Sequence, residues 1–158
     1  MLAAYTLLHV IISLIGIVSG FVVLFGLLGN KRLDCCTKTF LISTVLTSVT
    51  GFFFPVHHFM PSHGVGIISL VLLAVAIYAR YARGLNGGWR KTYVITAVMS
   101  FYLNFFVLIV QSFLKIPALH SLAPTQTEPP FKITQLIALV IFIILTVLAA
   151  IRFKKDAV

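Results

Sequence analysis

We expect an all-α fold, a polytopic membrane bundle of five transmembrane helices, because of three features of the sequence. Hydrophobic residues make up 60% of the 158 residues and charged residues 9%, against about 45–50% and about 25% in soluble domains. The apolar residues form five long runs, and short basic clusters separate these runs. The composition excludes a soluble domain, and the placement of the basic clusters indicates membrane topology rather than nucleic-acid binding.

Each apolar run has roughly 18–22 residues, and about 20 suffice for a helix to cross the hydrocarbon core. The first run has no basic residue before it and exceeds the roughly 7–15 apolar residues of a signal peptide, so we expect a retained span. Arg80 falls inside the third run, where we expect its side chain to reach the lipid headgroups. We predict one transmembrane domain, 1–158, with spans at about 7–28, 40–59, 65–82, 93–114 and 133–153.

The basic residues predict the orientation. In a bundle of five spans the first loop, the third loop and the C-terminus share one side, and ten of the twelve basic residues lie there. The positive-inside rule makes this side cytoplasmic, with the N-terminus outside. We expect the inner (plasma) membrane of a bacterium. The ten residues are Lys31, Arg32, Lys38, Arg80, Arg83, Arg90, Lys91, Arg152, Lys154 and Lys155.

Small and hydroxylated residues in the first two runs indicate how the helices pack. Gly16 and Gly20 form a small-xxx-small element, which lets helix backbones approach closely, either within the bundle or in a homodimer. Pro55 predicts a kink near Gly51 in the second run. The hydroxyls of that run either bond to their own backbone and to neighbouring helices or form a polar track towards the outer surface. They belong to Ser43, Thr44, Thr47, Ser48 and Thr50.

The fourth run carries the amides Asn104 and Gln111, which lie seven residues apart and therefore on one helix face. Asn104 lies near mid-membrane, so protein or water must satisfy its amide. An interhelical hydrogen bond would do so, and a ligand contact is the alternative. The aromatic residues around Asn104, with Tyr102 among them, suit helix packing but also a quinone, a porphyrin or a lipid. Asn104, Gln111 and Tyr102 are therefore candidate ligand-binding residues.

All five histidines map to the predicted outer side. His57, His58 and His63 flank the second loop together with Met60. Imidazole binds zinc, copper, nickel and iron, a thioether favours copper(I), and haem needs an axial histidine. The spacing matches no defined zinc motif, and amphipathic histidines also suit a membrane interface without any ligand. We treat the three histidines as candidate ligands of a metal ion or haem, with interface placement or proton handling as alternatives.

The sequence offers little for catalysis. None of the three acidic residues, Asp34, Glu128 and Asp156, lies in a predicted span, which disfavours a carrier that moves protons through a membrane carboxylate. Neither an HExxH nor a GxSxG motif is present. The adjacent Cys35 and Cys36 lie on the predicted cytoplasmic side without a second cysteine pair, so we expect them to be inert. These features favour a protein that is not an enzyme.

The sequence thus predicts a small multi-pass membrane protein with an outer-facing vestibule of histidine and polar residues. This vestibule would bind a metal ion, haem or a quinone-like lipid. The alternative is a structural or assembly subunit of a larger membrane complex, with no ligand of its own. In both cases the protein contacts the lipid bilayer and no nucleic acid, and a homo-oligomer or a larger complex is compatible with the sequence.

Two reporters test the five-span orientation. A reporter active only in the cytoplasm is expected to be active after Val158, because the basic residues hold that side in the cytoplasm. A reporter active only outside the cytoplasm is expected to be active near Ser62. The opposite result at either position would contradict the orientation.

Overall fold

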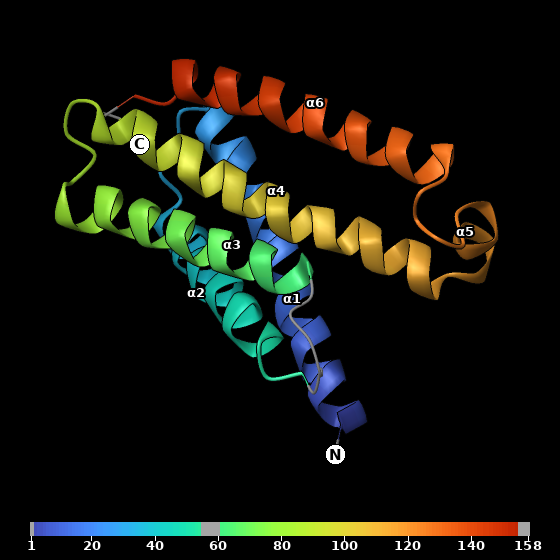
Figure 1. The fold of residues 1–158 in the computed structure, drawn as a ribbon. Helices are drawn as coiled ribbons and strands as arrows, with labels where there is room; N and C mark the ends of the chain where they lie inside the picture. The colour runs from blue at the N-terminus through green and yellow to red at the C-terminus, as the bar shows by residue number, and fades with distance from the viewer. Residues whose placement is uncertain (1, 55–60, 155–158) are drawn as a thin grey trace.

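The computed structural model describes residues 2–54 and 61–154, and every regular element within them is helical. The predicted all-α fold is confirmed, since no strand occurs in these residues. A π-helical turn, η1, continues the third helix (Figure 1). The elements are α1 (Leu2–Leu28), α2 (Asp34–Gly51), α3 (Pro61–Ile77), η1 (Tyr78–Ala82), α4 (Trp89–Lys115), α5 (Pro117–Leu122) and α6 (Pro129–Arg152).

Four helical segments are long and apolar enough to cross a membrane. Many of their outward-facing side chains are large and apolar, such as Val18 on α1 and Ile151 on α6, which are 64% and 69% exposed. Such a surface suits lipid rather than water. The protein is therefore an integral membrane helical bundle in contact with the bilayer. The four segments are Leu2–Leu28, His63–Ala82, Trp89–Lys115 and Pro129–Arg152.

The remaining predicted span, 40–59, corresponds to α2, which is shorter and richer in hydroxyls than those four. It begins earlier than expected, at Asp34, and ends at Gly51, near the expected kink. A proline at position 55 accounts for this end, because its ring would clash with the Gly51 carbonyl and the preceding residue is biased away from helix. The described residues thus leave the count of five spans as a prediction.

α4 contacts all the other helices and organises the bundle. α3 and α6 lie along it, and α2 packs mainly against α1 (Figure 1). α1 crosses α4 and then runs away from it towards the N-terminus. The short α5 follows α4 directly and precedes α6.

The crossing of α1 and α4 depends on two glycines. A Cβ atom added to Gly20 would lie 2.6 Å from Cδ2 of Phe101, and one added to Gly16 would lie 3.0 Å from Nδ2 of Asn104. The first distance is one that Cβ atoms essentially never show, so a side chain at Gly20 would force Phe101 to move, and the second is tighter than most Cβ contacts. The expectation that the glycine pair packs within the bundle is confirmed.

The prediction that Arg80 reaches the headgroups is wrong. Arg80 is 3% exposed, and its guanidinium forms an ion pair with Asp34 at the start of α2. It also donates to the Arg32 carbonyl at 3.3 Å and lies 5.2 Å from the ring centroid of Tyr93. The sequence argument considered Arg80 alone, whereas the fold brings a carboxylate to it, and this pairing offsets the cost of burying the charge.

Further bonds join distant parts of the chain on the Arg80 side, which we call the basic end. Arg90 of α4 donates to the Ala150 carbonyl of α6 at 3.3 Å. The backbone N–H of Lys154 donates to Oδ1 of Asn30, in the loop between α1 and α2, at 2.7 Å. The first loop, the start of α4 and the end of α6 therefore meet at one end of the bundle.

Replacing Gly20 with alanine is expected to lower the free energy of unfolding by about 1–3 kcal/mol, as overpacking does in well-packed cores. Gly64→Ala is the matched control, because no atom of the described residues lies within 4 Å of a Cβ added to Gly64. It should be neutral or slightly stabilising, since alanine favours helix. Unfolding in mixed micelles measures both, and equal stabilities of the two variants would contradict the described helix crossing.

Candidate functional site

A pocket of about 600 Å³ lies between α1, α2, α3 and α4, away from the basic end. We call this pocket the vestibule. Most of its surface is apolar, and polar side chains from all four helices interrupt it. Its described lining residues are Thr6, His9, Val10, Ser13, Leu14, Ile17, Thr47, Ser48, Gly51, Phe52, Phe54, His63, Val65, Gly66, Ser69, Leu103, Asn104, Val107, Leu108, Gln111, Ser112, Lys115 and Ile116.

The vestibule follows from the helix crossing described above. α1 and α4 approach closely at the glycines and diverge beyond them (Figure 1). The vestibule lies between their far halves. His9, Ser13 and Gly16 recur at intervals of four and three residues, so they share one face of α1. Asn104 and Gln111 likewise share one face of α4. The two polar faces border the same space.

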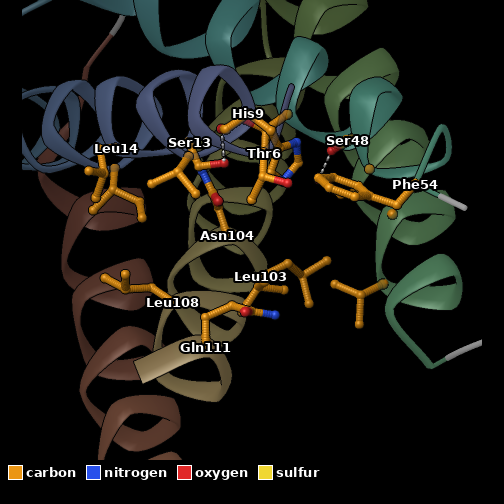
Figure 2. Close-up of a pocket in the computed structure, with 18 of the residues that line it drawn as sticks. Thr6, His9, Ser13, Leu14, Ser48, Phe54, Leu103, Asn104, Leu108 and Gln111 are labelled. Atoms are coloured by element: carbon orange, nitrogen blue, oxygen red, sulfur yellow. Dashed lines mark hydrogen bonds between the residues drawn. The ribbon is translucent and has the colours of Figure 1, made fainter. Parts of the chain in front are cut away.

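Asn104 forms the deep end of the vestibule and points towards α1 (Figure 2). It is 8% exposed, which confirms the expected burial. Its Nδ2 has no hydrogen-bond partner among the described residues, so the expected interhelical bond is not made by this atom. A Cβ added to Gly16 would meet Nδ2 at 3.0 Å and the hydroxyls of Ser43 and Thr44 at 3.2 Å each. Polar atoms from α2 and α4 therefore converge on α1 here.

His9 lies on the wall of the vestibule and is half-buried. Its Nδ1 is 2.7 Å from the Thr50 hydroxyl, and its ring meets that of Phe54 edge-on at 5.1 Å between centroids. Ser13 donates to the His9 carbonyl at 2.8 Å, and the Tyr5 hydroxyl donates to the Thr50 carbonyl at 2.6 Å. The two bonds to Thr50 hold α1 against the end of α2, and the one from Nδ1 fixes the position of the imidazole.

A charged side chain lies at the rim of the vestibule. Gln111 and Lys115 are exposed near the end of α4, and Lys115 is the one permanently charged side chain among the described lining residues. Eleven residues separate Asn104 from Lys115, or about 16 Å along the helix. His63 lies on the α3 side, where its ring stacks on Phe52 at 5.7 Å between centroids. No carboxylate belongs to the described lining.

The structure brings together three of the candidate residues, Asn104, Gln111 and His63. Tyr102 is not a lining residue, and its ring packs against Phe142 of α6 at 5.4 Å between centroids. Its position explains this, because two residues correspond to about 200° around a helix, so Tyr102 and Asn104 face opposite ways. His57 and His58 lie outside the described residues.

His9 and Ser13 are polar residues of the site that the sequence argument left out. Their spacing with Gly16 could have revealed them, because it places two polar side chains on the helix face that packs inward.

The hydroxyls of α2 fit both hypotheses of the sequence analysis, bonds to their own backbone and a polar track. Ser43, Ser48 and Thr50 donate to backbone carbonyls of their own helix, whereas Thr47 and Ser48 also line the vestibule.

The described residues do not form a complete set of metal ligands. Within 2–54 and 61–154, no three histidine, cysteine or acidic side chains lie together as metal ligands would. A site that uses His57 and His58 stays a prediction. Cys35 and Cys36 are free thiols near the basic end, far along α2 from the vestibule.

In comparisons with known proteins, no family model, no curated protein and no solved structure matches the chain.

Proposed function

We propose that the protein binds a small quinone-like lipid in the vestibule, with a carbonyl or similar hydrogen-bond acceptor at Asn104. The Nδ2 atom of Asn104 carries this proposal. It is a buried donor that no described residue satisfies, and it belongs to a residue that lines a pocket. An unsatisfied amide in the hydrocarbon costs several kcal/mol, so a ligand that supplies an acceptor gains a specific interaction there.

The size and character of the vestibule support this class of ligand. About 600 Å³ falls within the roughly 300–1,000 Å³ typical of small-molecule sites. Its mainly apolar walls, with polar groups at a few points, suit a ring with an apolar tail. An amide N–H attracts an acceptor oxygen, whereas it would repel a metal cation placed at the same point. The deep end therefore favours a quinone-like head over a bare ion.

Apolar side chains provide a route for such a ligand. Val10, Leu14 and Ile116 line the vestibule and are also 40%, 45% and 47% exposed. The vestibule thus continues into an apolar surface that faces lipid in a bilayer. A lipid-soluble molecule can enter from the membrane without crossing water.

The basic end supports an orientation in which the vestibule faces outwards. The ion pair and backbone bonds there bring the loops with most basic residues to one end. By the positive-inside rule this end belongs in the cytoplasm, and we propose the bacterial inner membrane as the location.

A structural or assembly subunit of a larger membrane complex is the second candidate. One observation favours it: many serine and threonine hydroxyls donate to carbonyls of their own helix, as residues that only pack helices do. In that case Asn104 has no ligand, and the apolar surface of α6 would contact partner helices.

Binding of a decyl-tailed benzoquinone to the purified protein in micelles separates the two candidates. We expect saturable binding with one molecule per chain, and a loss of about tenfold in affinity for Asn104→Leu, because the ligand carbonyl loses its donor. The variant should keep its helical circular-dichroism signal and thermal stability, since Nδ2 makes no bond to the described residues. An absorption spectrum of the protein as purified accompanies the titration.

Gln135→Leu is the matched control. Gln135 is a buried amide of α6 that donates to the Phe106 carbonyl at 3.3 Å and does not line the vestibule. Its removal should leave quinone binding unchanged. Absence of saturable binding, with copurifying membrane proteins instead, would support the subunit. A Soret band or stoichiometric metal would overturn the quinone-like ligand in favour of haem or an ion.

A further inference from the structure

We infer that the vestibule selects a ligand that carries a phenolic hydroxyl, such as a quinol, because His9 presents a hydrogen-bond acceptor in the same pocket as the Asn104 donor. This inference rests on the proposed function, since it concerns the same pocket. It names the ligand group that His9 recognises, a phenolic hydroxyl. It also makes Thr50 a positioning residue for His9.

The hydrogen bonds of Thr50 assign the tautomer of His9. The Thr50 hydroxyl lies 2.7 Å from the Leu46 carbonyl and 3.2 Å from the Thr47 carbonyl, and from these two acceptors we infer that it donates its one proton to that backbone. Its oxygen then accepts from Nδ1 of His9, which lies 2.7 Å away. Nδ1 therefore bears the ring proton, and Nε2 keeps a free lone pair.

The lone pair of Nε2 faces the vestibule. Nδ1 is turned to α2, so Nε2 lies on the far edge of a ring that lines the pocket. No described residue donates to Nε2, and this atom is not among the fully buried polar atoms. A neutral ring in this state accepts a hydrogen bond but cannot donate one from Nε2. A ligand hydroxyl satisfies it, and a carbonyl or an ether oxygen does not.

The spacing of the two polar groups suits a ring with oxygens at opposite ends. Asn104 meets α1 at Gly16, whose backbone lies seven residues from that of His9, or about 10 Å along the helix axis. A hydroquinone ring flanked by two hydrogen bonds of about 2.8 Å each covers a comparable distance. Phe54, edge-on to His9, adds an aromatic wall for such a ring.

The test compares a decyl-tailed hydroquinone with its dimethyl ether, which keeps the ring and tail but has no hydroxyl proton. Both are titrated anaerobically into the purified protein in micelles. We expect the wild type to bind the hydroquinone about tenfold more tightly, since the ether leaves Nε2 unpaired. His9→Phe should bind the two probes equally. Asn104→Leu should weaken both and keep the preference, because both probes retain oxygens that can accept from Asn104.

Thr50 provides a second pair of variants. Thr50→Val removes the oxygen that accepts from Nδ1 and should reduce the preference, whereas Thr50→Ser should retain it. The ¹⁵N chemical shifts of His9 should show a proton on Nδ1 in the wild type. Equal binding of both probes to the wild type, or a proton on Nε2, would overturn the inference alone. If neither probe nor the benzoquinone binds, the proposed function fails and this inference with it.

Discussion

The close approach of α1 to its neighbours at Gly16 and Gly20 is the constraint on which the rest of the structure depends. Lipid tails are as apolar as leucine, so membrane helices associate through tight packing and polar contacts rather than through the hydrophobic effect. At Gly20 the ring of Phe101 fills the space of a side chain, and at Gly16 the amide of Asn104 does so. The crossing therefore builds the core on one side and sets the deep end of the vestibule on the other.

The surroundings of the buried polar groups differ between the two ends of the bundle. At the basic end the buried guanidinium of Arg80 is paired with Asp34 and stacks near Tyr93, so a charge inside the protein is neutralised by a partner. At the vestibule, Nδ2 of Asn104 has no partner among the described residues, and Nδ1 of His9 lies 2.7 Å from the Thr50 hydroxyl. Buried atoms without a partner among the described residues occur at both ends, since Nη1 of Arg80 and the Tyr93 hydroxyl also lack one. We attribute a binding role to the vestibule because its unpartnered amide belongs to a residue that lines a pocket, whereas Arg80 and Tyr93 line no part of it.

Much of the fold could be predicted from the sequence, because the length of an apolar run and the spacing of glycines depend only on residues that are close together in the chain. The four apolar helices, the packing of Gly16 and Gly20, and the shared face of Asn104 and Gln111 all follow from helical periodicity. Arg80 and His9 could not be placed in this way, since their partners, Asp34 and Thr50, lie more than forty residues away in the chain. Tyr102 was assigned to the site by its nearness in sequence, whereas the rotation of the helix turns it towards α6.

The side-chain amide of Asn104 offers the most direct test of the account. The chain contains three asparagines, and Asn30 and Asn86 lie in loops, away from the vestibule. In protein labelled with ¹⁵N at asparagine, a titration with decyl-tailed benzoquinone should shift the NH₂ resonances of Asn104 and leave those of Asn30 and Asn86 unchanged, because only Asn104 donates to the ligand. An unshifted Asn104 at saturating quinone, or equal shifts of all three asparagines, would contradict a ligand site at the crossing of α1 and α4.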